Sequence, residues 1–391
     1  MTPTIAPPIV PPCIVCEGTR WTKLPDPGPQ SMASDWRVVP EPLSRWACDE
    51  CGLARRHPSS VTGESLYASG YGLYAHAPGE AREGARQEEY ARWIADVVPQ
   101  VPARALDVGC GNGSLLRALR PHWPRTALLG CDPSAESITH GAGDGLQLWC
   151  GTADDLPHDA ADLVMSVNVI EHTADPLAFV LALRHALSPG GRLVLVCPDG
   201  GRPGVELLFA DHLFSFARPH LEALLARAGM PVVSTAIAPP ALGAFQMVVA
   251  DREARPEAGA PVGANLPGGS APFTSVLPDG RRAYLDRWRR LDAHLQSRLG
   301  TTTVCFGAGE AAGLLRAYAP RAWSTVRACT VDGEAMGVFG DLPIIPLDSV
   351  RADETILLGL RPSDQPRVAE RLGARFRHVV TWYDFVDDER V

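Results

Sequence analysis

Residues 107–113 read Asp107-Val108-Gly109-Cys110-Gly111-Asn112-Gly113 and extend a short apolar run that begins at Ala105. The pattern predicts a strand over residues 105–108 and a helix that includes residues 115–119. Glycine has no Cβ, so three glycines at alternate positions let the backbone approach a bound molecule closely. The helix that follows offers free backbone N–H groups at its N-terminus. Strand, glycine loop and helix together predict a site for a nucleotide-like ligand.

Two acidic residues accompany this loop. Asp107 precedes the first glycine, and Asp132 ends the next expected strand, in Gly130-Cys131-Asp132-Pro133. The spacing Gly-x-Gly-x-Gly differs from the Gly-x-Gly-x-x-Gly of pyrophosphate binders. Asp107 can accept a hydrogen bond from a ligand ammonium group, which S-adenosylmethionine (SAM) has and NAD lacks there, and Asp132 can bind both ribose hydroxyls. We therefore predict that SAM is bound by Asp107, Gly109, Gly111, Asn112 and Asp132.

Two later segments complete the expected cofactor site. Thr152, Ala153 and Asp154 follow Gly151 and can supply polar contacts to adenine. Asn168 follows the fourth strand, in Asn168-Val169-Ile170-Glu171-His172, and so lies at the carboxyl edge of the sheet, where ligands of open α/β sheets bind. Four elements in this order indicate a ligand site more strongly than a glycine loop alone, which can also be only a turn.

The rest of the chain alternates short apolar runs with helical patterns, which predicts an α/β fold with a mostly parallel sheet. The strands are expected at residues 105–108, 126–131, 161–167 and 192–197, and helices at 88–98 and 176–187. Residues 252–279 are dense in Pro, Gly and Ala and are interpreted as a linker, followed by a helix from Arg281 to about Leu299. The domains expected are a small module over 1–75, a SAM-binding domain over 76–251, the linker, and a C-terminal αβ domain over 280–391.

Two cysteine pairs mark the first module. Cys13 and Cys16 form one Cys-x-x-Cys pair, and Cys48 and Cys51 form the other. Four thiolates suit one tetrahedral zinc ion, and a bound metal would stabilise a module with little apolar core. A redox motif is the alternative, but neither pair lies in a βαβ pattern. We predict structural zinc.

A second glycine loop occurs near the C-terminus, in Gly307-Ala308-Gly309-Glu310-Ala311-Ala312-Gly313, and Asp332 ends the strand expected after it. The pattern is similar to a dinucleotide-binding loop, with the third glycine one position late. Two interpretations stay open: a nucleotide site, or an αβ domain that builds one wall of a substrate site.

Composition excludes some classes of function. The chain of 391 residues has a formal net charge of -9, which argues against nucleic-acid binding. No apolar run approaches the roughly 18 residues of a membrane helix, and the N-terminus has no signal-peptide pattern. We expect a cytoplasmic protein with a small-molecule substrate; the sequence indicates no particular protein partner.

The region 88–250 resembles class I SAM-dependent methyltransferases on the four cofactor elements. The order of cysteine pairs, first glycine loop and second glycine loop resembles, over nearly the whole chain, the nucleotide-deoxysugar C-methyltransferases. This resemblance implies a zinc-binding N-terminal module, a class I methyltransferase domain and a C-terminal Rossmann-like domain. It also implies a nucleotide-linked sugar, or a related natural-product intermediate, as substrate. The loop Gly109-Cys110-Gly111-Asn112-Gly113 is closer to general methyltransferases than to that family's usual Gly-Ser-Asn-Asp-Gly.

The resemblance also implies catalytic residues. Leu208-Phe209-Ala210-Asp211-His212 is similar to the family's Tyr-x-Glu-His segment, so His212 corresponds to the general base and Asp211 to the assisting acid. Phe209 replaces the family's tyrosine, which removes a hydroxyl from the proton relay. Further candidates near the cofactor edge are His172 and Tyr74, the latter in a group with Tyr67, Tyr71 and His76 that could equally cover the cysteine module.

Three functions follow as hypotheses. The first is a C-methyltransferase that acts next to a keto group of its substrate, for example an enzyme of antibiotic biosynthesis. The second is a homologue that closes an aziridine ring with loss of sulfate and transfers no methyl group, for which the change at Phe209 leaves room. The third is a non-catalytic binding partner, which the full set of cofactor residues disfavours. Formation of S-adenosylhomocysteine separates the first from the second, and SAM binding separates both from the third.

Overall fold

The computed structural model describes residues 11–57, 81–98, 100–252, 271–333 and 337–386. Two compact units divide the chain. The first unit takes Met1–Thr22, Trp46–Glu206 and Asp211–Pro278, and the second takes Lys23–Arg45, Leu207–Ala210 and Asp279–Val391. Residues 23–45, which the sequence groups with the cysteine pairs, thus belong to the second unit. This segment lies between the two cysteine pairs in the sequence, but its contacts are with residues far along the chain.

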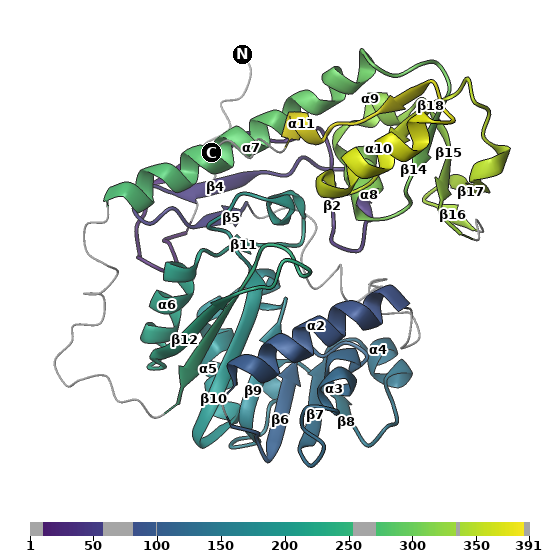
Figure 1. The fold of residues 1–391 in the computed structure, drawn as a ribbon. Coiled ribbons are helices and arrows are strands. Elements are labelled where there is room, and N and C mark those ends of the chain that lie inside the picture. Colours follow the sequence, from purple (N-terminus) through teal and green to yellow (C-terminus); the bar gives the residue numbers. More distant parts are fainter. Residues whose placement is uncertain (1–10, 58–80, 99, 253–270, 334–336, 387–391) are drawn as a thin grey trace. The chain divides into compact units, whose positions relative to one another are not determined.

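The first unit is built on a sheet with the strand order β12-β13-β10-β9-β6-β7-β8. Its strands are β6 (Arg104–Val108), β7 (Ala127–Asp132), β8 (Gln147–Cys150), β9 (Ala161–Val167), β10 (Leu187–Pro198), β12 (Val232–Ile237) and β13 (Phe245–Asp251). Of these seven strands, β13 alone runs in the direction opposite to the others. The first strand β6 lies in the middle of the sheet, so the loop after it opens between the loops after β7 and β9 (Figure 1).

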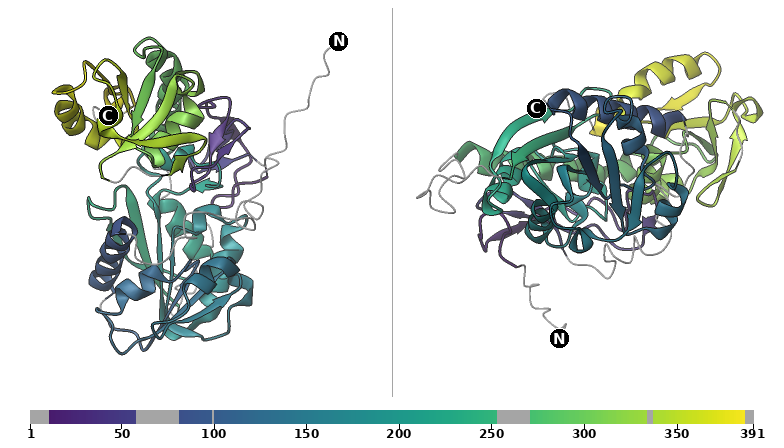
Figure 2. Two further views of the ribbon diagram at one scale, coloured as in Figure 1. Left: turned by 90° about the vertical axis from the view of Figure 1, so that its right-hand side faces the viewer. Right: turned by 90° about the horizontal axis from the view of Figure 1, so that it is seen from below.

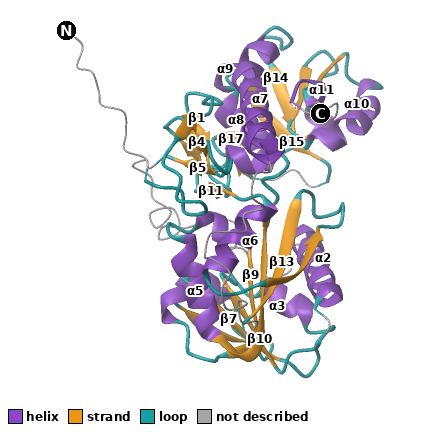
Figure 3. Ribbon diagram, turned by 90° about the vertical axis from the view of Figure 1, so that its left-hand side faces the viewer, coloured by secondary structure: helices purple, strands orange, loops and turns teal. Residues whose placement is uncertain are grey.

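Helices cover both faces of this sheet (Figure 3). They are α2 (Ala81–Val97), α3 (Ser114–Leu119), α4 (Ala135–His140), α5 (Pro176–Ala186) and α6 (Arg218–Arg227), with short 3-10 turns η1 (Ala153–Asp155), η2 (Ile170–His172) and η3 (Val205–Leu208). Successive residues of β10 face opposite sides: Leu195 packs in the core with α5 and α6, and Val194 packs in the core with α2 and α3. This continuous apolar run is typical of a parallel strand that is buried on both faces.

A smaller sheet has the order β1-β4-β5-β11. Its strands are β1 (Trp21–Lys23), β4 (Arg45–Cys48), β5 (Ala54–Arg56) and β11 (Phe214–Ser215). Within the first unit, β5 follows the second cysteine pair and pairs antiparallel with β11, which begins two residues after His212. The cysteine module is therefore hydrogen-bonded to the segment that carries the candidate base.

The second unit contains its own parallel sheet, with the order β16-β17-β15-β14-β18-β19, and helices around it (Figure 2). Its strands are β14 (Thr303–Phe306), β15 (Val326–Val331), β16 (Val338–Phe339), β17 (Leu342–Pro346), β18 (Thr355–Leu358) and β19 (His378–Val380), together with the pair β2 (Ser31–Met32) and β3 (Val38–Val39). Its helices are α8 (Glu310–Tyr318), α9 (Pro320–Trp323), α10 (Gln365–Gly373) and α11 (Tyr383–Val386), with the 3-10 turns η4 (Leu347–Ser349) and η5 (Pro362–Asp364). It also contains α7 (Ala271–Gln296) from Asp279 onward. Among the described strands of the six-stranded sheet only β16 pairs antiparallel, and β2 and β3 pair antiparallel with each other.

Helix α7 begins at Ala271, ten residues before the start expected from the sequence, so residues 271–279 of the expected linker are helical. Pro278 and Gly280 lie inside it and gave the segment the composition of a linker, because proline and glycine lower helix propensity. No helix within the described ranges combines the length and the apolar character that a membrane crossing requires.

Candidate cofactor and active site

The first glycine loop has the backbone that its sequence predicts. Gly109, Gly111 and Gly113 have φ values of 84°, 53° and 76°, which lie in the left-handed region that favours glycine. A Cβ on Gly109 would lie 2.3 Å from Cγ2 of Val169. The loop therefore passes directly against the residue that follows Asn168, which joins the carboxyl ends of β6 and β9 into one site.

Asp107 is a buried carboxylic acid for which the described residues supply no counterion. Its side chain is 2% exposed, and Oδ1 has no hydrogen-bond partner among the described residues. Burial, and secondly the charge of Asp132, raise the pKa of Asp107 to about 7. A buried, unpaired carboxylate is costly unless a cation or a donor reaches it. A ligand ammonium group would remove this cost, so the residue fits the role predicted for it in SAM binding.

Asp132 holds the loop in place. One carboxylate oxygen accepts a hydrogen bond from the backbone N–H of Gly111 and the other from that of Ser134, each at 2.8 Å. Burial raises its pKa, and these two hydrogen bonds act in the opposite direction. Each oxygen keeps a further lone pair, so the carboxylate can also accept from two ribose hydroxyls.

Other residues predicted to bind the cofactor form hydrogen bonds within their own loops. Asn112 is buried, and its Oδ1 accepts from the N–H of Ser114 at 3.1 Å. The N–H and hydroxyl of Thr152 donate to Asp155, at 2.8 and 3.0 Å, at the start of the turn that contains Ala153 and Asp154. A direct contact of these four residues with SAM stays a prediction.

Asn168 lies in a strained position at the end of β9, with φ of 58°. Its Nδ2 donates to the hydroxyl of Tyr90 at 3.3 Å, and its Oδ1 is buried without a partner among the described residues. Arg86 donates to the same hydroxyl at 3.2 Å from one turn earlier on α2. Arg86 and Tyr90 are site residues not predicted from the sequence, where their spacing of four residues on one helix was the available signal.

The candidate catalytic residues meet in a second cluster. His172 Nδ1 lies 2.9 Å from the backbone carbonyl oxygen of Asp211 and 3.7 Å from its Oδ2. The rings of His172 and His212 meet edge to face, with centroids 4.8 Å apart. The backbone N–H of Leu213 donates to the carbonyl of Glu171 at 2.7 Å and holds the two segments together. The structure thus joins three of the four candidates, while Tyr74, like Tyr67, Tyr71 and His76, lies outside the described residues.

Glu171 is a residue of this cluster that the sequence analysis did not select. Its side chain is 2% exposed, and neither carboxylate oxygen has a hydrogen-bond partner in the described part of the chain. Oε1 lies 4.0 Å from His172 Nε2. Burial raises the pKa of Glu171 to about 7, against a smaller opposite effect of His172. Its position beside a candidate histidine was the only sequence signal.

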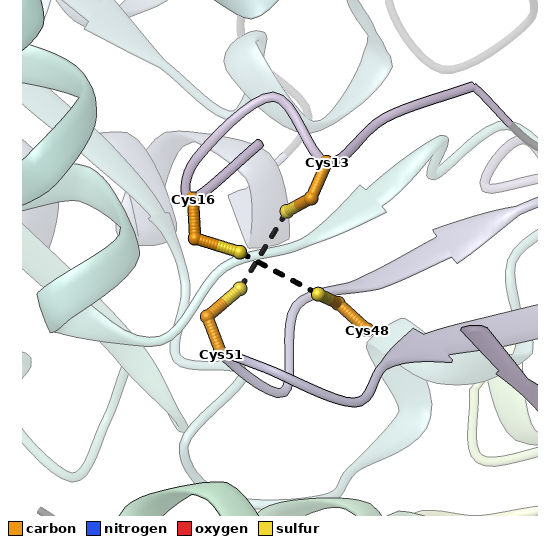
Figure 4. A group of neighbouring side chains, drawn as sticks. All are labelled: Cys13, Cys16, Cys48 and Cys51. Carbon is orange, nitrogen blue, oxygen red and sulfur yellow. Dashed lines mark hydrogen bonds between the residues drawn. The ribbon is translucent and has the colours of Figure 1, made fainter. Parts of the chain in front are cut away.

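The four cysteines predicted to bind zinc converge (Figure 4). The Sγ atoms of Cys13 and Cys51 are 3.5 Å apart, and those of Cys16 and Cys48 are 3.6 Å apart. Four sulfurs around one zinc at Zn–S distances near 2.3 Å would be about 3.8 Å apart, so the cluster fits a tetrahedral ion. The group is compatible with a metal and needs little movement to hold one.

The cysteine cluster is attached to the methyltransferase-like part of its own unit. His220 of α6 accepts at Nδ1 from the N–H of Ala217 at 3.0 Å, so its Nε2 carries the proton and donates to the carbonyl of Cys51 at 2.8 Å. Arg227, at the end of the same helix, donates to the carbonyl of Ile14. Both contacts bind the turns that carry the cysteines.

Known proteins are similar to one part of this chain, the part that contains the first glycine loop. A family model described as "Methyltransferase domain" matches residues 82–235. The malonyl-[acyl-carrier protein] O-methyltransferase of Herminiimonas arsenicoxydans is 37% identical over 111 residues, which cover 28% of this chain and 42% of the relative. The ubiquinone biosynthesis O-methyltransferase of Xylella fastidiosa (strain 9a5c) is 35% identical over 108 residues, 26% of this chain and 44% of the relative.

Among solved structures, the mitomycin 7-O-methyltransferase MmcR is similar at 20% identity with a TM-score of 0.42, covering 50% of this chain and 61% of that chain. The chain spans less than half the length of the two curated relatives named above. The sheet order, the glycine loop and the family match agree, and residues 82–235 of this protein are a SAM-dependent methyltransferase domain of the class I, Rossmann-like fold.

Proposed function

We propose that this protein is a SAM-dependent C-methyltransferase that acts on a small molecule next to a keto group, with His212 as the general base. The observation that carries the proposal is the contact of His212 with His172 at the carboxyl end of β9. Val169, three residues before His172, packs against Gly109 of the cofactor loop. His172, which contacts His212, and the glycine loop therefore lie at the same edge of one sheet, which supports a base beside the proposed methyl-donor site.

The chain's own residues supply binding and proton transfer. Asp107 would accept from the ammonium group of the cofactor, and Asp132 would accept from its ribose. SAM, when bound, supplies an activated methyl group. His212 takes the proton from the carbon next to the keto group, and the electron pair left on that carbon is the nucleophile. Asp211 holds His172 through its backbone carbonyl, and His172 packs against His212 and limits the positions of its ring.

The nature of the substrate rests on sequence resemblance. A nucleotide-linked deoxysugar, or a related natural-product intermediate, is the substrate class that the similarity to the deoxysugar C-methyltransferases suggests. The names of the relatives add small-molecule and carrier-protein substrates of O-methyltransferases. These classes share methyl transfer to an oxygen or carbon atom that has lost a proton. A base near the cofactor suffices to remove that proton.

The test is the variant His212→Ala, assayed with labelled SAM. Turnover should fall on the order of 10²–10⁴-fold, the usual contribution of a general base. SAM affinity, measured by calorimetry, should change little because the cofactor loop is formed by other residues. The exposed His122 of the same domain offers a matched control, since His122→Ala should leave turnover unchanged. Turnover of His212→Ala within a few-fold of the parent would exclude His212 as the base.

Ring closure without methyl transfer is the second candidate, and Phe209 is the observation that favours it. A family member that lacks the tyrosine hydroxyl has lost part of the relay that serves carbon deprotonation. In this reaction His212 would deprotonate an amine, and the nitrogen would displace a sulfate. Product formation without S-adenosylhomocysteine would support this candidate and contradict methyl transfer. Failure to bind SAM at all would instead favour a non-catalytic binding partner.

We also propose that Cys13, Cys16, Cys48 and Cys51 hold one structural zinc ion. The converging thiols and the contacts of His220 and Arg227 support this proposal. Elemental analysis of protein purified without chelator should find about one zinc per chain. Cys48→Ser should lose the metal and unfold at a lower temperature, whereas the exposed Cys150→Ser should do neither. Parent protein without zinc would contradict the proposal.

A further inference from the structure

We propose that Glu171, His172 and His212 form a second metal site, which takes one divalent transition-metal ion and which, when filled, removes His212 from proton abstraction. The binding half of this proposal is independent of the proposed function, and only the inhibitory half rests on it. The site is separate from the four-cysteine cluster and contains no thiolate.

Three potential ligand atoms converge from two segments. One atom from each of Glu171, His172 and His212 lies within 4.8 Å of the others. Glu171 and His172 belong to η2, directly after β9, and His212 lies between η3 and β11. The hydrogen bond from the N–H of Leu213 to the carbonyl of Glu171 fixes the two segments against each other. The grouping therefore depends on backbone pairing and not on the chance position of flexible side chains.

The orientation of His172 is that of a metal ligand. A carbonyl oxygen only accepts, so the 2.9 Å contact between His172 Nδ1 and the carbonyl of Asp211 places a proton on Nδ1. In the neutral ring the lone pair then lies on Nε2, which faces Glu171 Oε1 at 4.0 Å. Metal-ligating histidines commonly donate their other ring N–H to a carbonyl or a carboxylate in this way.

Glu171 provides a second, independent observation. Its carboxylate is 2% exposed and neither oxygen has a hydrogen-bond partner within the described residues. In that part of the chain its only ion-pair partner is His172, at the long distance of 4.0 Å. A buried carboxylate without a hydrogen-bond donor is costly, and a positive charge bound to it removes that cost. A metal ion placed between this carboxylate and the imidazole lone pair would bind both.

The ligand set selects a class of ion. Two imidazole nitrogens and one carboxylate oxygen suit Zn²⁺, Co²⁺, Ni²⁺ or Fe²⁺ and leave positions open for water. Ligand atoms about 2.1 Å from an ion would be about 3.4 Å apart, so the three side chains need to close by roughly 1 Å. The side chain of His172 is 12% exposed, which gives an ion a path to the site.

Metal binding and base catalysis exclude each other at His212. An imidazole lone pair that is bound to a metal cannot accept a proton. An ion in this site would therefore stop a reaction that starts with proton abstraction by His212, without touching the cofactor loop. The proposed methyltransferase would therefore be active only when this cluster holds no metal ion.

The experiment is a Co²⁺ titration of the full chain after the cysteine cluster has been loaded with one equivalent of zinc and excess zinc has been removed. The parent should bind one further equivalent, with visible d–d absorption but without the thiolate charge-transfer bands of a cysteine site. Glu171→Gln, which keeps size and loses charge, should weaken this binding at least tenfold, and His172→Phe should do the same. The exposed acid Glu136, on α4, gives the control Glu136→Gln, which should bind like the parent.

Circular dichroism and the thermal midpoint establish that each variant is folded. Equal Co²⁺ affinity in the parent, Glu171→Gln and His172→Phe, or no further equivalent in the folded parent, would overturn the site. In the activity arm, Co²⁺ should inhibit the parent and a weak chelator should restore it. Binding without inhibition would overturn the inhibitory half. An inactive protein that still binds Co²⁺ in the expected way would contradict the proposed function alone.

Discussion

The two glycine loops of this protein have nearly the same sequence pattern and different surroundings. Gly109-x-Gly111-x-Gly113 follows β6 in the first unit, and Gly307-x-Gly309 with Gly313 follows β14 in the second. Helix α3 begins directly after Gly113 in the first unit, and helix α8 begins directly after Gly309 in the second and includes Gly313. An aspartate lies at the end of the next strand in each, Asp132 in the first and Asp332 in the second. Their surroundings differ in features that a ligand site requires and that glycine spacing alone does not provide.

Each glycine motif contains positions that leave little room for a side chain. A Cβ on Gly307 would lie 2.3 Å from the carbonyl oxygen of Gly359, and one on Gly313 would lie 2.7 Å from Sδ of Met32. A Cβ on Gly109 would meet Val169 at the same distance as the first of these. Glycine is therefore required at these positions whether or not a ligand binds, because backbone and side chains approach closely.

The acidic residues separate the loops. Asp107 is buried, and one of its oxygens has no hydrogen-bond partner in the part of the chain that the structure describes. The matching position, two residues before Gly307, is the thiol of Cys305. Asp332 is exposed, and its carboxylate accepts from Arg371 at 2.8 Å. Within the described ranges, the first loop thus has a buried carboxylate without an ion-pair partner, which a cationic ligand can neutralise, and the second loop has none at these two positions. A buried charge without a partner, more than the glycine spacing, marks the ligand site.

The largest effect is expected from Gly109→Ala. The added methyl group would clash with Val169, and the φ of 84° is unfavourable for alanine. Overpacking and left-handed strain together should cost about 3 kcal/mol of folding free energy in the first unit. Chemical denaturation followed by tryptophan fluorescence measures this loss, and SAM affinity should fall with it. A variant as stable as the parent would show that the loop can move away from Val169.

Asp132→Ala should weaken SAM binding by about 1.5–3 kcal/mol, since it removes charged hydrogen-bond acceptors from the ribose site. That loss corresponds to roughly 10–150-fold in the dissociation constant. The same substitution at the matching position of the other loop, Asp332→Ala, should leave SAM affinity within about twofold. Isothermal calorimetry on both variants makes the comparison. Equal losses would mean that the aspartates do not distinguish the two loops.

The pH dependence of SAM binding tests the buried charge directly. The pKa of Asp107 is raised to about 7 in the ligand-free protein, so below pH 7 the residue holds a proton that must leave before it can accept from an ammonium group. Affinity should fall as the pH drops from 7 to 5.5, by at most about tenfold per unit. Asp107→Asn should bind SAM more weakly and lose this dependence. An unchanged slope in that variant would assign the proton to another group, such as Asp132.

The same raised pKa has a consequence for stability with the opposite sign. Between the pKa of an unfolded aspartate, about 3.9, and about 7, the folded protein binds more protons than the unfolded chain. The contribution of Asp107 to stability therefore falls as the pH rises through this window. Without SAM, Asp107→Asn should raise the thermal midpoint at pH 8 relative to the parent, and the difference should shrink towards pH 4.

Much of the first unit was predictable from its sequence. The strands β6, β7, β9 and β10 are continuous apolar runs next to helical patterns, and each lies where the sequence predicts a strand. The fold class is confirmed by the sheet order and the family match. The placement of Asp107 and Asp132 at neighbouring strand ends follows from the parallel order, because carboxyl ends of parallel strands meet at one edge.

Other features depend on contacts that no local pattern contains. Glu171 looks like an ordinary acidic residue, and its importance comes from burial by segments more than thirty residues away, such as that of His212. Residues 23–45 belong to the second unit because their partners lie near Tyr318 and Gly313. The early start of α7 was missed because Pro278 outweighed the surrounding pattern. These differences come from tertiary contacts that override local propensity.

The smallest effect is expected from Gly309→Ala, in the loop of the second unit that shows no unpaired buried charge. Gly309 has φ of −141°, an extended backbone that alanine adopts readily, and a Cβ there would have nothing within 4 Å. A compatible Gly→Ala change stabilises by about 0.4–1 kcal/mol, because the unfolded chain loses freedom. The thermal midpoint should therefore rise slightly, with SAM affinity and turnover unchanged. A ligand that approached this loop as closely as dinucleotides approach theirs would clash with the new methyl group, so lower turnover in folded Gly309→Ala would show that the second loop binds part of the substrate. That result would remove the distinction between the two loops, whereas a slightly more stable and fully active variant would support it.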